Sequence, residues 1–522
     1  FAVKDFRDYV KKLKAAKVIL DPAERRRAIL EGARAAAKAK RLELVEDEGL
    51  LAENAGLTEW PVPLMGAFDE GFLDVPPEVL TTSMKAHQKC FSVRGPSSLS
   101  PSNGRPASSP SPLTGEGRGG AKRSAPAAPN PSPQGGGASL SNHFILVANL
   151  VAKDRGKAII EGNGRVIRAR LSDAKFFWDQ DCRHTLESRL PKLNELIFHA
   201  RLGTVHDKAH AIARLAMDLS EVIPGANRRH CEQAALLAKA DLVSGMVGEF
   251  PELQGIMGRY YALNDKLPAD VADAIAQHYS PLGPNDAVPA HPTAIVAAIS
   301  DKLYSLVGFF GIDERPTGSR DPYALRRSAL GIIRIVLENN LRLSLREWFG
   351  RTAEVYRDIG ENVVRKHWTG AYDVNVELLT FFHDRLKVYL RDRGARHDLI
   401  DAVISPDADD LLMIVARVEA LGKFLDTDDG ATLLAGVRRA TSILRIEEKK
   451  DAREYTGAPD GSLYAGNEER ALAAAIDVAK REASEAVARE DFAAAMRALA
   501  KLRAPVDACF DHGTVNADDT AL

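Results

Sequence analysis

The residues with the clearest potential for chemistry are three dipeptides in which an imidazole stands beside a carboxylate. They are His206-Asp207, His383-Asp384 and His397-Asp398. Side chains of these types hold divalent cations, and a bound cation can activate water for the hydrolysis of a phosphate ester. Such a site also needs a separate His and a distant Asp on other helices. With 13 His in 522 residues, roughly one such dipeptide arises by chance, so surface charges or helix-end contacts are the simpler interpretation.

The helical block 196–340 has the element order of the HD superfamily of metal-dependent phosphohydrolases. LLAKADLVSGM (236–246) falls where that superfamily places its His-Asp helix, and AISDKLYSL (298–306) is similar to its later Asp helix. Lys239 stands where the His would be, and a cation beside Asp241 competes with a metal ion. Only Asp241 and Asp301 remain of the ligand set. We therefore expect a degenerate HD-like fold that holds no metal.

Motifs that would form a self-contained active site are absent from the sequence. It has no GxxxxGK[ST] phosphate loop, no helical zinc pair and no GxSxG elbow, and the glycines of EGNGR (161–165) lack the setting of a dinucleotide site. The four cysteines are scattered and form no CxxC pair, so neither a disulfide scaffold nor a thiolate zinc site is supported, and a reducing compartment is indicated. In a long chain this favours a binding or accessory subunit, with no catalytic residue and no cofactor of its own.

Paired arginines are the candidate contacts to nucleic acid. The formal net charge is −2, which excludes a chain that binds nucleic acid by being basic throughout, so any site must be local. Three pairs share a face at strand or helix spacing, and for each the alternative is a solvated surface. The pairs are Arg168 and Arg170 on one side of a predicted strand, Arg327 and Arg334 on the outward face of a predicted helix, and Arg438 and Arg445 beside the apolar stripe of another.

The elements that must position these residues are mostly helical. Residues 1–45 space apolar side chains by three and four, with Asp21 as a helix N-cap and Pro22 at the first helical position. Residues 50–180 are predicted to be mixed α+β, in which VIRARL (166–171) alternates as a half-buried strand does. From Pro191 onward the pattern predicts helices, and the Ala-rich stretch 468–510 is typical of an antiparallel helix pair.

Residues 95–139 differ in composition from the rest of the chain, since 28 of these 45 positions are Gly, Pro or Ser. Such a composition buries too little apolar surface to offset the loss of chain entropy, so we expect a disordered insert. KCFSV (89–93) before it and HFILVANL (143–150) after it are strand-like runs, which places the insert inside one domain.

Several stretches together resemble the β subunit of the bacterial two-subunit glycyl-tRNA synthetase. EFPELQG (249–255) followed by PTGSRDPYALRR (316–327) is the most specific of them. The others are SMKAHQK (83–89), HFILVAN (143–149), EGNGRVIRARLSDAKFF (161–177), RLGTVHDK (201–208) and LAKADLVSGM (237–246), with weaker similarity at VRRATSIL (437–444) and APVDACFDHGTVNADD (504–519). The family's Leu-Leu-Glu-Ile-Gly opening and its last helix are missing, which implies a chain truncated at both ends.

The resemblance implies a mainly α, multidomain chain. Its expected parts are an α+β tRNA-binding domain at 1–190 that carries the insert, a degenerate HD-like helical domain at 191–345, a helical linker at 346–410 and a helical anticodon-binding domain at 411–522.

The resemblance also implies that this chain binds tRNA(Gly) as the non-catalytic subunit of a glycine–tRNA ligase. Glycine activation with ATP and Mg²⁺ then occurs on a separate α subunit, in an α2β2 tetramer. We expect a cytoplasmic location without a membrane segment, because the opening FAVKDFRDYVKK is charged where a secretory signal is apolar. The alternative function is an HD-type metal-dependent nucleotide phosphohydrolase.

Overall fold

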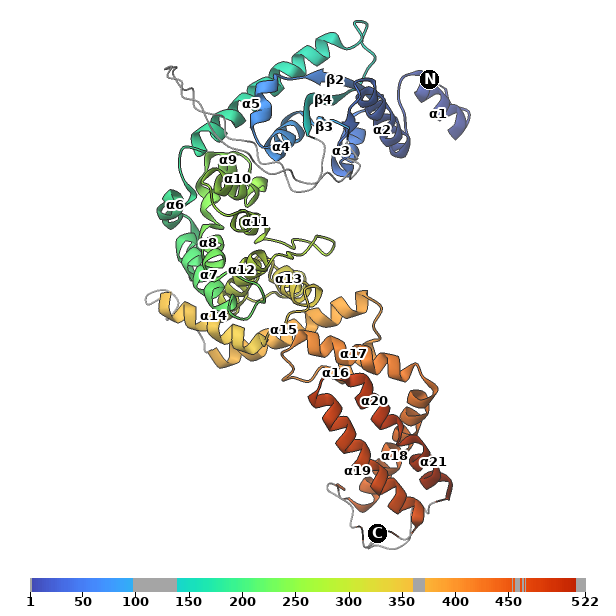
Figure 1. The fold of residues 1–522 in the computed structure, drawn as a ribbon. Helices are drawn as coiled ribbons and strands as arrows, with labels where there is room; N and C mark the ends of the chain where they lie inside the picture. The colour runs from blue at the N-terminus through green and yellow to red at the C-terminus, as the bar shows by residue number, and fades with distance from the viewer. Residues whose placement is uncertain are drawn as a thin grey trace, which may run out of the picture. The chain divides into compact units, whose positions relative to one another are not determined.

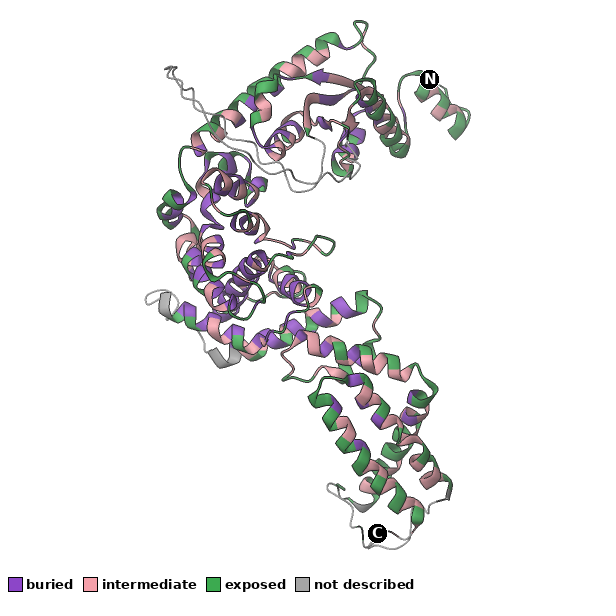
Figure 2. Cartoon of the chain, viewed as in Figure 1, coloured by how far each residue is buried: buried purple, intermediate pink, exposed green. Residues whose placement is uncertain are grey.

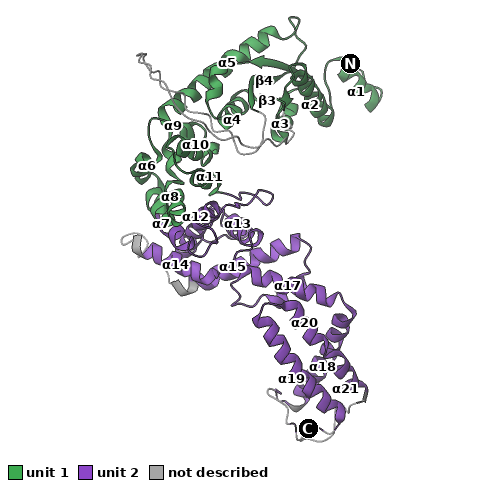
Figure 3. Ribbon diagram, in the orientation of Figure 1, with its two compact units in different colours: residues 1–198, 204–213, 227–279 green, residues 199–203, 214–226, 280–522 purple. Residues whose placement is uncertain are grey.

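The chain is mainly helical in a computed structural model that describes residues 2–96, 139–359, 371–452, 454–455, 461, 464 and 466–512 (Figure 1). The predicted fold class is thereby confirmed. The chain divides into two compact units (Figure 3). The first comprises residues 1–198, 204–213 and 227–279, and the second comprises residues 199–203, 214–226 and 280–522. Helix α7 (Val205–Leu219) contributes residues to both.

The first unit contains a four-stranded antiparallel sheet with the strand order β1-β3-β4-β2. Its strands are β1 (Glu43–Leu44), β2 (Val62–Ala67), β3 (Phe91–Arg94) and β4 (Leu140–Ala148). The strands predicted on either side of the insert are confirmed as β3 and β4, which pair with Phe91 opposite Ile145. Residues 97–138, nearly all of the expected disordered insert 95–139, lie outside the described residues.

Helices surround this sheet and continue beyond it within the first unit. Their bounds are α1 (Phe6–Ala15), α2 (Pro22–Ala39), α3 (Glu48–Leu57), α4 (Pro77–Gln88), α5 (Lys157–Asp181), α6 (Leu186–Arg189), α8 (Arg228–Leu237), α9 (Gly245–Glu249), α10 (Ile256–Asn264) and α11 (Ala269–Gln277), with 3-10 turns at Glu70–Asp74, Leu190–Glu195, Ala240–Val243 and Pro251–Leu253. The two predicted N-terminal helices are confirmed, and the Asp21 carboxylate accepts a hydrogen bond from the Ala23 backbone N–H, as an N-cap does.

The prediction of a strand at 166–171 is wrong, because these residues lie inside helix α5. Ile167 and Leu171 are buried while Ala169 between them is exposed. This is the pattern of a helix, in which residues four positions apart lie on the same face. Arg168 and Arg170 therefore do not share a side. Positions two apart on a helix point about 200° away from each other.

The second unit is built around helix α12 (Pro292–Gly311), which packs against α13, α14 and α15. By length and composition α12 could cross a membrane, but 94% of its apolar window is buried, and Figure 2 shows it almost wholly in the buried colour. It is the core helix of this unit. The other helices are α13 (Leu325–Glu338), α14 (Leu345–Ile359), α15 (Ala371–Asp392), α16 (His397–Val403), α17 (Leu411–Leu425), α18 (Asp428–Asp451), α19 (Asn467–Ala488), α20 (Phe492–Ala500) and α21 (Arg503–His512).

The Ala-rich stretch 468–510 forms three helices rather than the predicted pair. α19 packs against both α20 and α21, and the second expected helix is interrupted between Ala500 and Arg503. Pro505 lies in the first turn of α21, where its missing N–H costs no helical hydrogen bond. Two short strands, β5 (Ile197–His199) and β6 (Gly203–Thr204), precede the helical part that begins with α7.

Candidate nucleic-acid interface

Lys239 occupies the position expected of a metal-binding His, and its environment is that of a buried structural cation. Its side chain is 4% exposed, and Nζ lies 2.8 Å from His278 Nε2 and 3.8 Å from the centroid of the Tyr279 ring. His278 Nδ1 lies 2.6 Å from the Ile275 carbonyl oxygen, so Nδ1 is the protonated nitrogen and donates there. Nε2 then accepts from the Lys239 ammonium. The lone pair that a metal ion would need is already used.

Asp241 is fully buried and serves as an acceptor for backbone amides. Its Oδ2 accepts hydrogen bonds from the Gly255 N–H at 2.5 Å and the Gly258 N–H at 3.0 Å. Burial raises the pKa of Asp241 to about 6, and the two amide bonds oppose this rise because they favour the charged form. A Cβ at position 258 would lie 2.6 Å from Ile275 Cγ2, so only glycine permits this close approach.

In the part of the chain that the structure describes, the candidate ligands Asp241 and Asp301 do not belong to a clustered ligand set. Within the described ranges, no group of three or more His, Cys, Asp or Glu is placed to hold a metal ion. The Lys239 ammonium bonds His278 Nε2, and the amides of Gly255 and Gly258 bond one of the two carboxylate oxygens of Asp241.

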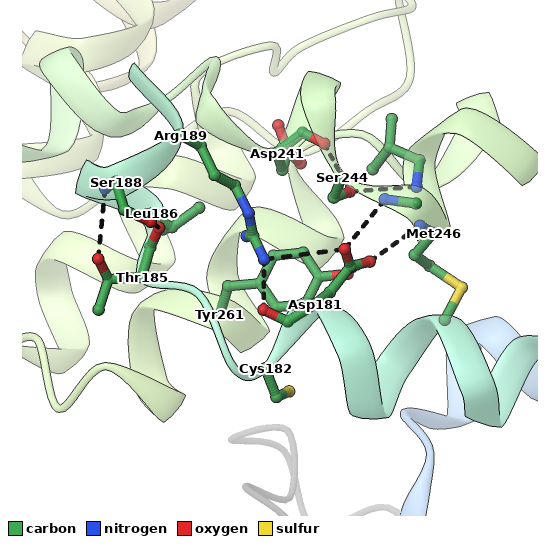
Figure 4. Close-up of polar contacts among 12 residues, drawn as sticks. Asp181, Cys182, Thr185, Leu186, Ser188, Arg189, Asp241, Ser244, Met246 and Tyr261 are labelled. Atoms are coloured by element: carbon green, nitrogen blue, oxygen red, sulfur yellow. Dashed lines mark hydrogen bonds and ion pairs between the residues drawn. The ribbon is translucent and has the colours of Figure 1, made fainter. Parts of the chain in front are cut away.

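A second buried polar network in the first unit centres on Asp181, at the end of α5, and was not predicted from the sequence (Figure 4). Its carboxylate accepts hydrogen bonds from the backbone N–H groups of Gly245 and Met246 at 3.0 and 2.9 Å, and from the Tyr261 hydroxyl at 2.7 Å. Arg189 donates to the Asp181 carbonyl oxygen and lies 3.8 Å from its carboxylate. The network attaches the end of α5 to the start of α9. Its groups bond one another, which assigns them a structural role.

The three His-Asp dipeptides make contacts within the protein, two of them at helix ends. Asp207 accepts from the Thr204 N–H at the start of α7, and Asp398 pairs with Arg396 in the first turn of α16. His383 lies within α15, where Nε2 is 2.6 Å from the Ala408 carbonyl oxygen and burial lowers the pKa of the imidazole. The interpretation as helix-end contacts is confirmed for the first and third.

Burial also governs the cysteines nearest to the sheet and to the Asp181 network. It raises the pKa of Cys90 and of Cys182 to about 12. Both are therefore thiols at neutral pH, and neither has the low pKa of a nucleophilic cysteine.

The arginines of α5 are exposed, as a contact to a polyanion requires. Arg168 projects from the helix surface, and Arg170 lies 3.6 Å from Asp173 in a solvent-exposed ion pair. Exposed pairs of this kind contribute little to stability, so Asp173 holds Arg170 only weakly.

The two predicted arginines of α13 differ in exposure. Arg327 is exposed, but Arg334 is only 7% exposed, which contradicts the prediction that both face solvent. Arg334 donates to Glu338 Oε1 at 2.9 Å, to the Gly283 carbonyl oxygen at 3.0 Å and to the Asp286 carbonyl oxygen at 2.7 Å. The loop 281–286 thus covers this part of the helix. Arg334 holds the loop and is not free to contact a ligand with those atoms.

The arginines of α18 are both exposed, in agreement with the predicted outward face. Arg438 and Arg445 are seven residues apart and so lie within about 20° of each other around the helix. Within the described part of the chain neither forms an ion pair. Their neighbour Arg439 is different, because its guanidinium lies 4.4 Å from the centroid of the Phe510 ring of α21.

Two further arginines escaped the sequence analysis and lie near Arg327. Arg326, the residue before Arg327 in α13, and Arg385, on α15, line the same pocket as Arg327 and Arg334. Arg385 comes from a helix some 50 residues further along the chain, so no local spacing could have connected it to the others.

Comparison with known proteins places the whole chain in one family. The protein-family model described as glycyl-tRNA synthetase beta subunit matches residues 1–103 and 134–405. This chain is 49%, 48% and 46% identical, over 529, 520 and 525 residues, to the glycine–tRNA ligase beta subunits from Rhodospirillum centenum, Phenylobacterium zucineum and Paracoccus denitrificans. These alignments cover 99–100% of this chain and 66–68% of the relatives, so the chain spans about two thirds of their length. The chain belongs to the glycyl-tRNA synthetase beta subunit family.

Proposed function

We propose that this chain is the tRNA-binding β component of a glycine–tRNA ligase. In this proposal a separate α subunit activates glycine with ATP and Mg²⁺, and this chain binds tRNA(Gly) so that the acceptor end reaches the α active site. The carrying observation is the family match, which spans 1–103 and 134–405, together with relatives named beta subunits of glycine–tRNA ligase. An α2β2 assembly in the cytoplasm, with no cofactor bound by this chain, is part of the same proposal.

The surface chemistry supports a role in holding RNA. Guanidinium groups bind phosphates, and five of the six predicted arginines are exposed: Arg168, Arg170, Arg327, Arg438 and Arg445. They are distributed over helices of both units, as contacts to a large polyanion would be. Reading of single-stranded anticodon bases would need stacking and hydrogen-bonding groups, and the proposal assigns that task to the helical part 411–522.

The alternative of an HD-type nucleotide phosphohydrolase has no support in the comparisons, which match synthetase subunits throughout. Its chemistry would need a metal ion, and a Lys stands at the expected His position, with no group of three or more His, Cys, Asp or Glu placed to hold a metal among the described residues. We therefore retain the synthetase subunit alone.

Reconstitution tests the proposal directly. The chain is combined with the α subunit of a close relative, and both glycine-dependent ATP–pyrophosphate exchange and glycylation of tRNA(Gly) are measured. We expect glycylation to require both subunits and this chain alone to catalyse no exchange. Exchange by this chain alone at the rate of the complex, or full glycylation by α alone, would contradict the proposal.

A further inference from the structure

A pocket in the second unit has the charge and the shape to hold a single phosphate group. It lies between the loop 281–284, α13 and α15 and has a volume of about 190 Å³. Arg326, Arg327, Arg334 and Arg385 line it, and none of its lining residues is Asp or Glu. A liquid water occupies roughly 30 Å³, so the pocket is large enough to admit a phosphate and a few waters.

The hydrogen bonds divide the four arginines into two that bind the protein itself and two that keep donors for a ligand. Arg334 is fixed by Glu338 and by the carbonyl oxygens of Gly283 and Asp286, so it forms a wall of the pocket. Arg326 donates to the Gly318 carbonyl oxygen at 2.8 Å, which turns its guanidinium toward the preceding loop. These two arginines shape the pocket and add positive potential, and part of their donor capacity is engaged by the protein itself.

Arg327 and Arg385 retain donors for a ligand. Arg327 is exposed and makes no hydrogen bond or ion pair within the described part of the chain. Arg385 is half-buried, and its Nε is a buried donor without a hydrogen-bond partner among the described residues. A buried unpaired donor is costly unless a ligand or water completes it. The two guanidinium groups come from α13 and α15, so together they approach a group in the pocket from two sides.

The walls of the pocket are held in place before any ligand arrives. Lys302 of α12 donates to the Ser280 carbonyl oxygen at 2.7 Å, and Arg334 holds the other end of the same loop at Gly283 and Asp286. Asp286 in turn accepts from the backbone N–H groups of Leu282 and Gly283 at 3.0 and 2.8 Å. A site whose walls are fixed loses little entropy when it binds.

We infer that this pocket clamps one backbone phosphate of the bound tRNA, with Arg327 and Arg385 as its two donors and Arg334 as the residue that positions the loop. The inference rests on the proposed function, because it takes tRNA as the source of the phosphate. A phosphodiester presents two oxygens in one plane, and guanidinium groups match that geometry better than ammonium groups do.

Affinity for tRNA(Gly) across a salt series tests the clamp, with the full chain in complex with α. The variants are Arg327→Gln, Arg385→Gln and the double variant, and Arg351→Gln of α14 is the matched control because its guanidinium pairs with Glu347. Each single variant should lower affinity about three- to tenfold and flatten the log–log salt slope by about 0.7–0.9, the amount of one phosphate contact. The double variant should lose no more slope than one phosphate contact, since both arginines hold the same group.

Arg385→Lys keeps the charge but not the planar donors, so it should retain most of the slope while losing part of the affinity. Thermal unfolding of each variant separates lost binding from lost folding.

Several results would overturn the inference. Unchanged affinity of the folded Arg385→Gln variant would do so, and so would additive effects of the two substitutions, which would indicate separate phosphates. Binding of inorganic phosphate or ATP that disappears in Arg385→Gln while tRNA affinity stays normal would assign the pocket to a free anion instead. Each of these leaves the proposed function standing. A wild-type complex without tRNA affinity would contradict the proposed function itself.

Discussion

Arg327 and Arg334 are seven positions apart on one helix, but replacing them should have different effects on the stability of the folded chain. Replacing Arg334 with Ala removes three hydrogen bonds and leaves the carbonyl oxygens of Gly283 and Asp286 without that donor, which should cost roughly 2–4 kcal/mol. Arg327→Ala is the matched control and should change stability by less than about 0.5 kcal/mol, because its side chain is exposed. Urea unfolding measures both. Equal stability of the two variants would contradict the structural role of Arg334.

The difference between these two arginines shows what helical spacing can and cannot predict. Spacing identified the side of α13 that faces away from its own apolar stripe, and Arg327 and Arg334 share that side because they lie about 20° apart around the helix. It could not identify the loop 281–286 that covers Arg334, because that loop is some 50 residues away in sequence. The side of the helix on which each arginine lies was predictable, whereas the exposure of its side chain depended on tertiary contacts.

Asp241 should make stability depend on pH in the direction opposite to that of an ion-paired carboxylate. Its pKa is raised by burial to about 6 in the folded chain, above the ordinary value of 3.8. Between these values the folded state binds more protons than the unfolded state, so stability falls as pH rises from about 4 to 6. The loss should approach about 3 kcal/mol.

Asp241→Asn removes the titrating group, so its stability relative to wild type should improve over that pH range. Hydrogen exchange at the amides of Gly255 and Gly258, corrected for its intrinsic pH dependence, reports the change locally. A difference between variant and wild type that stays constant from pH 4 to 7 would show that Asp241 is ionised throughout.

At the scale of elements, helix α5 contains two glycines at positions where no steric constraint requires glycine. Gly162 and Gly164 lie inside Lys157–Asp181, and a Cβ at either position would meet no atom within 4 Å. Alanine at each should therefore stabilise the helix by about 0.5–1 kcal/mol, because it restricts the unfolded chain and adds no clash. The unfolding midpoint of the first unit should rise by about 1–4 °C per substitution.

Gly245→Ala is the control for these substitutions, since a Cβ there would lie 2.8 Å from Phe177 Cδ1. That variant should give no rise. A drop in the midpoint for Gly162→Ala or Gly164→Ala would indicate that α5 is not a continuous helix at these positions.

The misassignment of VIRARL has a definite physical origin. Apolar residues at positions 167 and 171 satisfy both a period of two and a period of 3.6, so they cannot distinguish strand from helix. Ala169 was the residue that appeared to decide for a strand, but alanine is small enough to be exposed without cost, and it is exposed. The strands β3 and β4 were predictable because KCFSV and HFILVANL are short apolar runs that contain aromatic and β-branched residues.

At the scale of the whole molecule, the charge composition and the family resemblance were better guides to the function of the chain than any single candidate residue. A net charge of −2 required local basic surfaces, and the structure shows exposed arginines on α5, α13 and α18. Arg385 could not be connected to the arginines of α13 from the sequence, because it approaches them only when α13 and α15 pack. Motifs that run contiguously along the chain, such as those near Lys239 and Asp241, carried the family signal instead.

The α18 arginines give the prediction that bears most directly on how a weakly acidic chain holds a polyanion. Arg438 and Arg445 share one exposed face, whereas Arg439 lies about 100° from Arg438 around the helix and stacks on Phe510. If the shared face contacts two tRNA phosphates, Arg438→Gln with Arg445→Gln should weaken binding of cognate and non-cognate tRNA alike. It should also flatten the log–log salt slope by about 1.4–1.8. Arg439→Gln removes one positive charge from the same helix but from another face, so the slope should stay at the wild-type value. Each of Arg438→Gln and Arg445→Gln alone, in contrast, should already flatten it. Affinities measured for the complex with α from low to moderate salt decide the matter. An unchanged slope in the double variant would return both arginines to ordinary solvated surface. An equal effect of Arg439→Gln would mean that α18 contributes net charge alone and no oriented contact.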